Sequence, residues 1–312
     1  MLDLVIDGRK TDLGGGFAVN RILPFRSRRM VGPFIFLDHA GPLDRPPAEL
    51  RKADVRPHPH IGLSTVSYLF SGRINHRDSL GYEQVIRPGE VNWMTAGRGI
   101  AHSERFDAPD QAAGGAIELL QSWVALPNEA EETAPNFANY RADALPEATE
   151  GGVWMRLIAG QAFGLSNAVK THSPLFYLHT VVQPGAKLGL PTGHSERAAY
   201  VAKGSVEFDG HIYKPGQMLV FKAGAQPTLI GRELATVMLM GGEPVGERFI
   251  WWNFVSSSVE RIKQAMDDWK AGRIPLPPHD KSEFIPLPTD RPLPGTPAGN
   301  PAKTAPAPEP IS

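Results

Sequence analysis

One strand-and-turn pattern occurs twice in this chain with identical internal spacing, and no other feature limits the possible fold as strongly. Tyr68-Leu-Phe-Ser-Gly72 is echoed by Tyr200-Val-Ala-Lys-Gly204. The run Pro88–Gly97 is echoed in the same way by Pro215–Gly224. Self-similarity of this kind indicates a repeated structural unit. The repeat therefore predicts two β-barrels with one strand plan, one in each half of the chain.

Composition agrees with a chain built from many short strands. At 312 residues and 41% hydrophobic composition, the chain is long enough for two ordinary domains, each with a sizeable core. The 32 Gly and 30 Pro interrupt short apolar segments, which favours strands joined by turns over long helices. The predicted strands include Thr65–Phe70, Glu90–Met94, Leu175–Val182, Ala198–Val201, Met218–Phe221 and Ala235–Met240.

The stretch Glu129–Gly152 differs in composition from its surroundings, because acidic residues, Pro and a Gly pair replace the apolar segments. We place the division between the halves there, with one unit over residues 1–140 and a second over residues 141–250. A helical segment is expected over residues 251–274, followed by a tail over residues 275–312.

The predicted helix covers Val259–Ala271 and is expected to pack across a barrel. Ser257 and Glu260 fit a capping box, and Gly272 with Pro275 ends the helix. Its apolar face comprises Val259, Ile262, Met266 and Trp269. The tail is Pro-rich without apolar periodicity, which predicts a disordered or extended segment.

Charge and residue content exclude several classes of protein. A formal net charge of −1 gives no broad electrostatic footprint for nucleic acid. With no Cys, any metal must be held by His and carboxylate groups. The first ten residues include acidic side chains, Asp3 and Asp7, where a signal peptide needs a basic region, and no apolar stretch approaches about 18 residues. We expect a cytoplasmic protein that neither binds nucleic acid directly nor enters a membrane.

Two short pairs carry candidate metal ligands: His58-Pro59-His60 and His102-Ser103-Glu104. On a strand, side chains at i and i+2 lie on the same face. Three imidazoles and one carboxylate form a mixed nitrogen and oxygen site suited to iron, copper, nickel, manganese or zinc. A single His-x-His pair is often satisfied by ordinary hydrogen bonds, but two pairs in one predicted barrel favour a metal site.

The second half lacks this ligand set. Counting from the repeat anchors, the four equivalent positions hold Leu190, Thr192, Leu229 and Gly231. His194-Ser195-Glu196 lies out of register and is interpreted as a loop or strand end. In the first half, His76-Arg77-Asp78 either lines an entrance or forms a polar hairpin turn.

The runs Pro57–Tyr68 and Trp93–Glu104 resemble the pirins, members of the cupin superfamily, and the similarity extends from about Ile22 to the late helix. This resemblance implies an all-β bicupin fold: two tandem β-barrels of jelly-roll type, with a C-terminal helix and a Pro-rich tail. It implies Fe(II) as the cofactor, with other divalent transition metals possible, held by His58, His60, His102 and Glu104.

The resemblance also implies two functions. One is oxidation of the flavonol quercetin by O₂, with a small aromatic substrate and Glu104 as the catalytic base. The other is metal-dependent, redox-sensing regulation through a protein partner. A purely structural metal is disfavoured because structural zinc sites are usually rich in Cys. Many pirins carry Glu where this chain has Ser64, so we expect a different polarity in the wall of the site.

Overall fold

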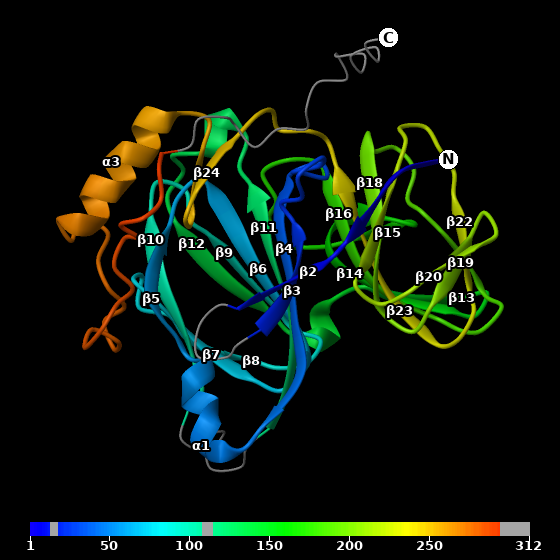
Figure 1. The fold of residues 1–312 in the computed structure, drawn as a ribbon, viewed down its shortest axis with the longest axis horizontal. Helices are drawn as coiled ribbons and strands as arrows, with labels where there is room; N and C mark the ends of the chain where they lie inside the picture. Colours follow the sequence, from blue (N-terminus) through cyan, green and yellow to red (C-terminus); the bar gives the residue numbers. More distant parts are fainter. Residues whose placement is uncertain (13–17, 108–114, 294–312) are drawn as a thin grey trace, which may run out of the picture.

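Each half of the chain folds into one large and one small antiparallel sheet, and the two units lie side by side (Figure 1). The computed structural model describes residues 1–12, 18–107 and 115–293. In this part of the chain, strands dominate and the longest helix is α3 (Val259–Lys270), alongside the short α1 (Pro47–Leu50). The predicted all-β, two-unit fold is confirmed.

The N-terminal unit is built from a seven-stranded sheet, in the order β12-β9-β6-β11-β4-β3-β2, facing a four-stranded sheet, in the order β5-β10-β7-β8. The large sheet comprises β2 (Arg9–Asp12), β3 (Ala18–Leu23), β4 (Phe34–Arg45), β6 (Leu63–Ser71), β9 (Val91–Thr95), β11 (Gly115–Ala125) and β12 (Asn136–Tyr140). The small sheet comprises β5 (Val55–His60), β7 (Ile74–Asp78), β8 (Glu83–Ile86) and β10 (Ile100–Arg105).

The C-terminal unit repeats this arrangement with an eight-stranded and a four-stranded sheet. The large sheet comprises β1 (Leu2–Asp7), β13 (Glu147–Glu150), β14 (Val153–Ala162), β15 (Leu165–Ser166), β16 (Leu175–Val182), β18 (Glu196–Lys203), β21 (Gln217–Phe221) and β23 (Ala235–Gly242). The small sheet comprises β17 (Lys187–Gly189), β19 (Val206–Phe208), β20 (His211–Tyr213) and β22 (Thr228–Gly231).

The sequence repeat corresponds to a structural repeat. In the N-terminal unit β6 pairs with β9, and Tyr68 lies opposite Val91. In the C-terminal unit β18 pairs with β21, and Tyr200 lies opposite Met218. Val91 and Met218 each follow the repeated Pro by three residues, so both the pairing and its register are the same in the two units.

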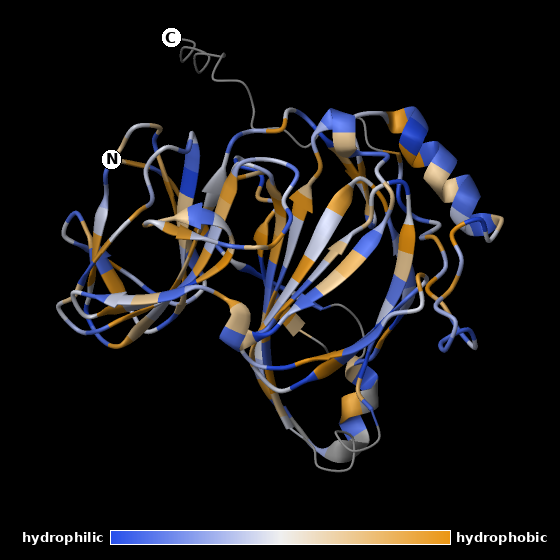
Figure 2. Cartoon of the chain, turned by 180° about the vertical axis from the view of Figure 1, so that it is seen from behind, coloured by the Kyte–Doolittle hydropathy of each residue, from blue (hydrophilic) through white to orange (hydrophobic). Residues whose placement is uncertain are grey.

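Side chains on one face of each large sheet form the hydrophobic core between the units. Val66 and Tyr68 of β6 share one buried cluster with Tyr177 and Tyr200 of the C-terminal unit. Figure 2 shows hydrophobic residues concentrated along the strands of both units. Because successive side chains of a strand point to opposite faces, these sheets bury one face between the units and the other inside their own unit.

Two reciprocal Tyr–His contacts cross this core. The Tyr68 hydroxyl lies 2.8 Å from Nδ1 of His179, and the Tyr200 hydroxyl lies 2.8 Å from Nδ1 of His39. Each tyrosine comes from one unit and its histidine from the other. Buried hydroxyl and imidazole groups need such partners, so these contacts satisfy polar atoms that the interface would otherwise leave unpaired.

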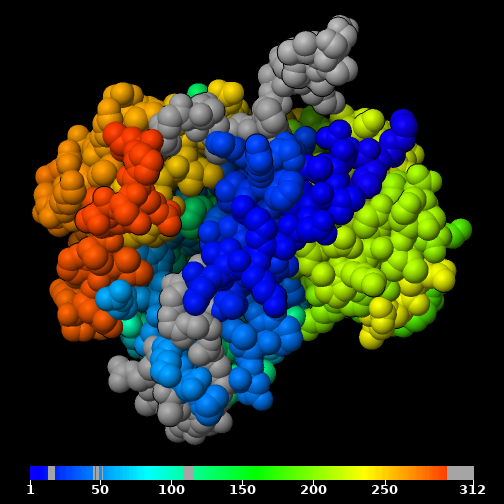
Figure 3. All heavy atoms as spheres, in the orientation of Figure 1, coloured from blue at the N-terminus to red at the C-terminus, as the bar shows by residue number. Residues whose placement is uncertain are grey.

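The two ends of the chain cross between the units. β1 pairs with β21 and so belongs to the C-terminal sheet, although the sequence division placed residues 1–140 in the first unit. Figure 3 shows this dark blue segment lying across the yellow-green C-terminal unit. Conversely, Phe254, Ile262 and Trp269 pack with Ile61 and Ala101 of the N-terminal unit. The division near residue 140 otherwise stays a prediction.

The predicted helix matches α3 except for its last residue and its cap. Ser258, not Ser257, accepts the capping hydrogen bond from the Arg261 N–H. The Ser257 hydroxyl and N–H instead donate to the Glu131 carboxylate. The antiparallel hairpin of β24 (Phe249–Trp251) and β25 (Phe254–Ser256) leads into the helix.

Beyond α3, residues 275–293 form neither helix nor strand but are held by specific contacts. The Trp269 indole N–H donates to the Ile285 carbonyl, and the Ile285 N–H donates to the Pro57 carbonyl on β5. The rest of the Pro-rich tail lies outside the described residues. None of the described helices is long and apolar enough to cross a membrane.

The contact of Tyr68 with His179 predicts a pH effect on stability. Burial, followed by the charges of Arg156 and Lys203, lowers the pKa of His179 from 6.5 to about 3. Between pH 6.5 and 3, His179 is therefore protonated in the unfolded chain but neutral in the folded protein. The free energy of unfolding consequently falls as the pH falls from 6.5 toward 3. His179→Gln should reduce this slope, measured by urea unfolding, by up to about 1.4 kcal/mol per pH unit.

Tyr68→Phe is the matched control. It removes the same hydrogen bond without removing the titrating group, so it should lower stability by a constant amount and leave the slope unchanged. Equal slopes for wild type and His179→Gln would show that folding leaves the pKa of His179 near its ordinary value.

Candidate metal centre

The antiparallel pairing of β5 with β10 brings the two predicted ligand pairs together. His102 lies opposite His58 and Ile100 lies opposite His60. The register then shifts, so that Glu104 lies opposite Val55. An extra residue in one strand of a pair re-aims the neighbouring side chains, and such bulges are frequent beside functional sites. The ring of His60 lies 5.3 Å from that of Trp123 on β11, so the pairs face the large sheet.

His58, His60 and His102 form a buried group whose candidate ligand atoms all lie within 4.8 Å of one another. Their ring centroids are separated by 4.4 to 5.1 Å. Burial lowers the pKa of His58 to about 4 and holds the pKa values of His60 and His102 well below their ordinary value. All three rings are therefore neutral at pH 7, which is the form that binds metal ions.

Unpartnered nitrogen atoms in this group match a metal site. Nδ1 of His60 and Nε2 of His102 are buried and have no hydrogen-bond partner among the described residues. Buried polar atoms in native proteins nearly always have one, so each exception requires a reason. A metal ion bound between the three rings would satisfy them, and a set of neutral imidazoles is a donor set that divalent transition metals accept.

Glu104 lies beside the histidine group but is not a member of it. Burial raises the pKa of its carboxyl group to about 7, and the Ser67 hydroxyl donates to Oε1 over 3.5 Å. Its side chain lines a cavity of about 60 Å³ that Asp38 and Gln121 also line. The role of Glu104 as fourth ligand stays a prediction, which requires its carboxylate to turn toward the three rings.

His76 and Asp78 lie closer to the predicted ligands than expected from the sequence. Both are buried on β7, the neighbour of β10, with Asp78 opposite His102 and His76 opposite Glu104. The predicted hairpin turn follows β7, where the Leu80 and Tyr82 N–H groups donate to Asp78. His76 and Asp78 themselves lie on the strand and not in the turn. They have the same i, i+2 spacing as the predicted ligand pairs, and that spacing on a third strand was the available signal.

Ser64 does not contribute to the wall of the site. On β6 it lies two residues from Val66, whose side chain faces the core between the units, whereas Ser67 faces Glu104. The Ser64 hydroxyl is hydrogen-bonded to that of Thr95 over 3.0 Å. Because successive side chains of a strand point to opposite faces, Ser64 points away from the site. The prediction that it changes the polarity of the site is therefore wrong.

The equivalent region of the C-terminal unit is apolar. Leu190 and Leu229, which occupy two of the positions equivalent to ligands, belong to the hydrophobic core of that unit. β18 begins at Glu196, which confirms the interpretation of the His194 segment as a strand end. The Glu196 carboxylate accepts from the Gly32 N–H and pairs with Arg28, both in the N-terminal half.

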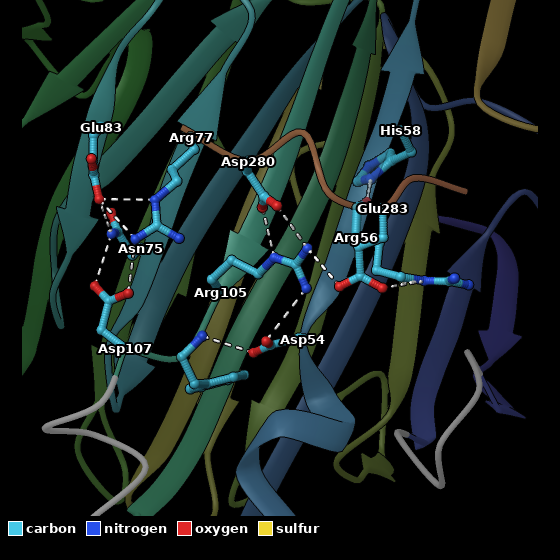
Figure 4. A network of polar contacts seen from close by, with 11 residues as sticks. Asp54, Arg56, His58, Asn75, Arg77, Glu83, Arg105, Asp107, Asp280 and Glu283 are labelled. Atoms are coloured by element: carbon cyan, nitrogen blue, oxygen red, sulfur yellow. Dashed lines mark hydrogen bonds and ion pairs between the residues drawn. The ribbon is translucent and has the colours of Figure 1, made fainter. Parts of the chain in front are cut away.

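The outer surface of β10 is held by residues 277–287, which we call the C-terminal strap. Figure 4 shows Asp280 and Glu283 of the strap pointing toward Arg105, the residue after Glu104. Arg105 donates to both Asp280 oxygens over 2.7 and 3.0 Å and pairs with Glu283 and Asp54. With the backbone bond of Ile285 to β5, the strap fixes both ligand-bearing strands from outside.

The strap should contribute measurably to stability through Asp280. Asp280→Asn removes a charge from the Arg105 network, and hydrogen bonds to charged groups contribute about 1.5–3 kcal/mol. We expect a loss in this range by urea unfolding. The matched control is Asp268→Asn, which breaks contacts to Arg273 and Arg261 on the more exposed surface of α3 and should cost about 0–1 kcal/mol. Equal losses would contradict a special role for the strap.

Comparison with known proteins gives the family. The family model described as Pirin matches residues 16–124, and that of the Pirin C-terminal cupin domain matches residues 177–275. A Pirin-like protein of Caulobacter vibrioides is 56% identical over 289 residues, which cover 92% of this chain and all of that protein.

Solved structures agree. A crystal structure of quercetin 2,3-dioxygenase from Acinetobacter baumannii is 30% identical, with a TM-score of 0.86 over 95% of this chain and 98% of its own. A second one from the same organism is 27% identical, with a TM-score of 0.81 over 88% and 98%. Since the two family models match in chain order, one on each unit, this chain belongs to the pirin family of two-domain cupins.

Proposed function

We propose that this protein is a cytoplasmic Fe(II)-dependent dioxygenase of the quercetin 2,3-dioxygenase type, acting on a flavonol-like substrate and O₂. The observation that carries the proposal is the juxtaposition of three neutral, buried imidazoles with the partly buried Glu104, whose carboxyl pKa is raised to about 7. The similarity to the Acinetobacter baumannii enzyme supports the choice of substrate class.

His58, His60 and His102 would hold the metal, with Glu104 as the fourth ligand. Bound divalent iron would supply a Lewis acid and one-electron chemistry toward O₂, with coordination positions left for small molecules. The imidazoles bring no charge, because burial keeps them unprotonated. With a divalent metal bound, the site would therefore carry a net positive charge that favours an anionic substrate.

Glu104 is the residue suited to act as the base. A base works best when its pKa lies near the working pH, and in the metal-free protein burial raises the pKa of Glu104 to about 7. In the carboxylate form it would take the proton of a flavonol hydroxyl and leave an electron-rich enolate. The proton then lies on a Glu104 oxygen, where the Ser67 hydroxyl is within 3.5 Å.

The cavity beside Glu104 limits how a substrate binds. Its volume of about 60 Å³ is small compared with the roughly 300 Å³ or more of typical ligand pockets. Asp38 in its wall is held by two hydrogen bonds from Arg21, whereas Phe106 and Leu119 are apolar. A three-ring flavonol therefore fits only if apolar lining side chains move apart and admit its hydroxyl-bearing edge.

A second candidate function is metal-dependent regulation through a protein partner. The observation that favours it is the contact of the C-terminal strap with Arg105, next to Glu104, since a change at the metal would reach an outer surface. Iron-loaded protein that consumes no oxygen with quercetin would favour this candidate. Equal capture of a partner by Fe(II), Fe(III) and metal-free protein would count against it.

Oxygen uptake with quercetin tests the proposed activity directly. Protein loaded anaerobically with Fe(II) should consume O₂ when quercetin is added, and Glu104→Gln should slow the reaction by roughly 10²–10⁴-fold, the usual contribution of a general base. Iron content is measured for both proteins, which separates loss of the base from loss of the metal. No uptake by fully loaded wild type would exclude the flavonol reaction.

Metal affinity should depend on pH through Glu104 alone. Below pH 7 its carboxyl group is protonated and must release one proton to bind a metal, whereas the histidines are already neutral. The Ni²⁺ association constant should rise about tenfold per pH unit up to roughly pH 7 and then level off. In Glu104→Gln the dependence should vanish between pH 6 and 8. Competition with a chromophoric chelator measures both, and a persisting slope would remove Glu104 from the ligand set.

A further inference from the structure

A third pair of side chains, His76 and Asp78, lies on β7, the strand that pairs with β10 and is therefore next to its predicted ligands. Asp78 is opposite His102 and His76 is opposite Glu104, and side chains of opposite residues in antiparallel strands project to the same face. His76 is 4% exposed and Asp78 is fully buried. Neither residue belongs to the three-imidazole group.

Hydrogen bonds connect a backbone turn to the metal centre through this pair. The N–H groups of Leu80 and Tyr82 donate to Asp78 Oδ1 over 2.9 and 3.2 Å. The other oxygen, Oδ2, lies 3.0 Å from His76 Nε2. His76 Nδ1 in turn lies 3.4 Å from Nδ1 of His102, whose remaining nitrogen, Nε2, has no partner in the described part of the chain.

The order of donors and acceptors along this series of hydrogen bonds determines which ring nitrogen carries each proton. A carboxylate only accepts, so Nε2 of His76 carries a hydrogen and donates to Asp78. With one proton on the ring, Nδ1 of His76 has a lone pair and accepts from Nδ1–H of His102. The lone pair of His102 is then on Nε2, which is the atom that lacks a partner.

We propose that Asp78 and His76 are positioning residues that fix the tautomer of His102, so that Nε2 is presented to the metal ion. The proposal rests on the metal centre of the proposed function but not on its flavonol chemistry. Histidines that bind metals generally donate their second N–H to a carboxylate, carbonyl or water. Here a second imidazole relays that role from Asp78.

His58 shows the simpler form of the same arrangement. Its Nδ1 lies 2.9 Å from the Arg56 carbonyl, an acceptor that leaves the lone pair on Nε2. For His102, the hydrogen-bond partner of Nδ1 within residues 1–12, 18–107 and 115–293 is the His76 ring and not a backbone carbonyl. The competing explanation is that His76 only packs, since its ring stacks on Phe137 at 4.2 Å with an interplanar angle of 9°.

Asp78→Asn reverses the chain of donors while keeping its shape. The amide oxygen can still accept from the Leu80 and Tyr82 N–H groups, but the amide NH₂ then faces His76 and donates to Nε2. His76 must then carry its proton on Nδ1, which drives the proton of His102 to Nε2. We expect ¹⁵N NMR of ring-labelled, metal-free protein to show Nδ1–H on His102 in wild type and Nε2–H in the variant.

The same variant should bind Ni²⁺ roughly 10–100-fold more weakly, the usual effect of losing an outer partner of a metal-binding histidine. His76→Phe provides an independent variant, because it keeps the ring stack on Phe137 and removes both nitrogens. It should also weaken Ni²⁺ binding, whereas a histidine that only packs would leave affinity unchanged.

The matched control is Glu118→Gln, which makes the same chemical change beside His39 at the boundary between the units. It should change neither the Ni²⁺ affinity nor the tautomer of His102. Wild-type Ni²⁺ affinity in both Asp78→Asn and His76→Phe, or Nε2–H on His102 in the wild type, would overturn the proposal. Wild-type protein that binds neither Ni²⁺ nor Fe²⁺ would instead refute the metal centre, while the NMR result still decides the tautomer.

Discussion

The pairing of β5 with β10 is the contact on which the candidate site depends. It places His58 opposite His102, although 44 positions separate them in the chain, and one register shift then sets the direction of Glu104. Both strands lie in a small sheet whose inner face meets the large sheet through Trp123 and Ser67. The C-terminal strap holds the outer face, so the pairing is constrained from two sides.

Burial of the three imidazoles favours metal binding but is unfavourable for the stability of the metal-free protein. Desolvation keeps the rings neutral and leaves two nitrogens without partners, which is unfavourable in the metal-free protein. The surrounding structure must supply the stabilisation, and most of it is apolar. The C-terminal unit contributes by covering the outer face of the N-terminal large sheet, where Tyr68 and Tyr200 reach across to His179 and His39. The C-terminal unit thus supports the unit that carries the candidate ligands.

The features that short stretches of sequence determine could be predicted. The repeat, the six strands, α3 and the ligand pairs could be predicted because strand alternation, turns and i, i+2 spacing are properties of short segments. The pairing of β1 with the C-terminal sheet could not be predicted. Its partner β21 lies more than 200 positions away, and the sequence of β1 does not specify a partner. Counting alternate residues from Tyr68 would have put Ser64 on the far face, and His76 with Asp78 lay within a segment that looked like a polar turn.

The ligands differ in how firmly the protein holds them, and this difference fits a division of roles. His58 is tied to the backbone and His102 to the pair on β7, so neither ring needs to reorient to bind a metal. Among the described residues, the hydrogen bond that holds Glu104 is the long one from Ser67, and its side chain borders a cavity. Preorganised ligands reduce the free energy lost to reorganisation on binding, whereas a base must be able to turn between partners. In the proposed function the imidazoles would therefore define where a metal binds, and the loosely held carboxylate would be the group free to exchange protons with a substrate.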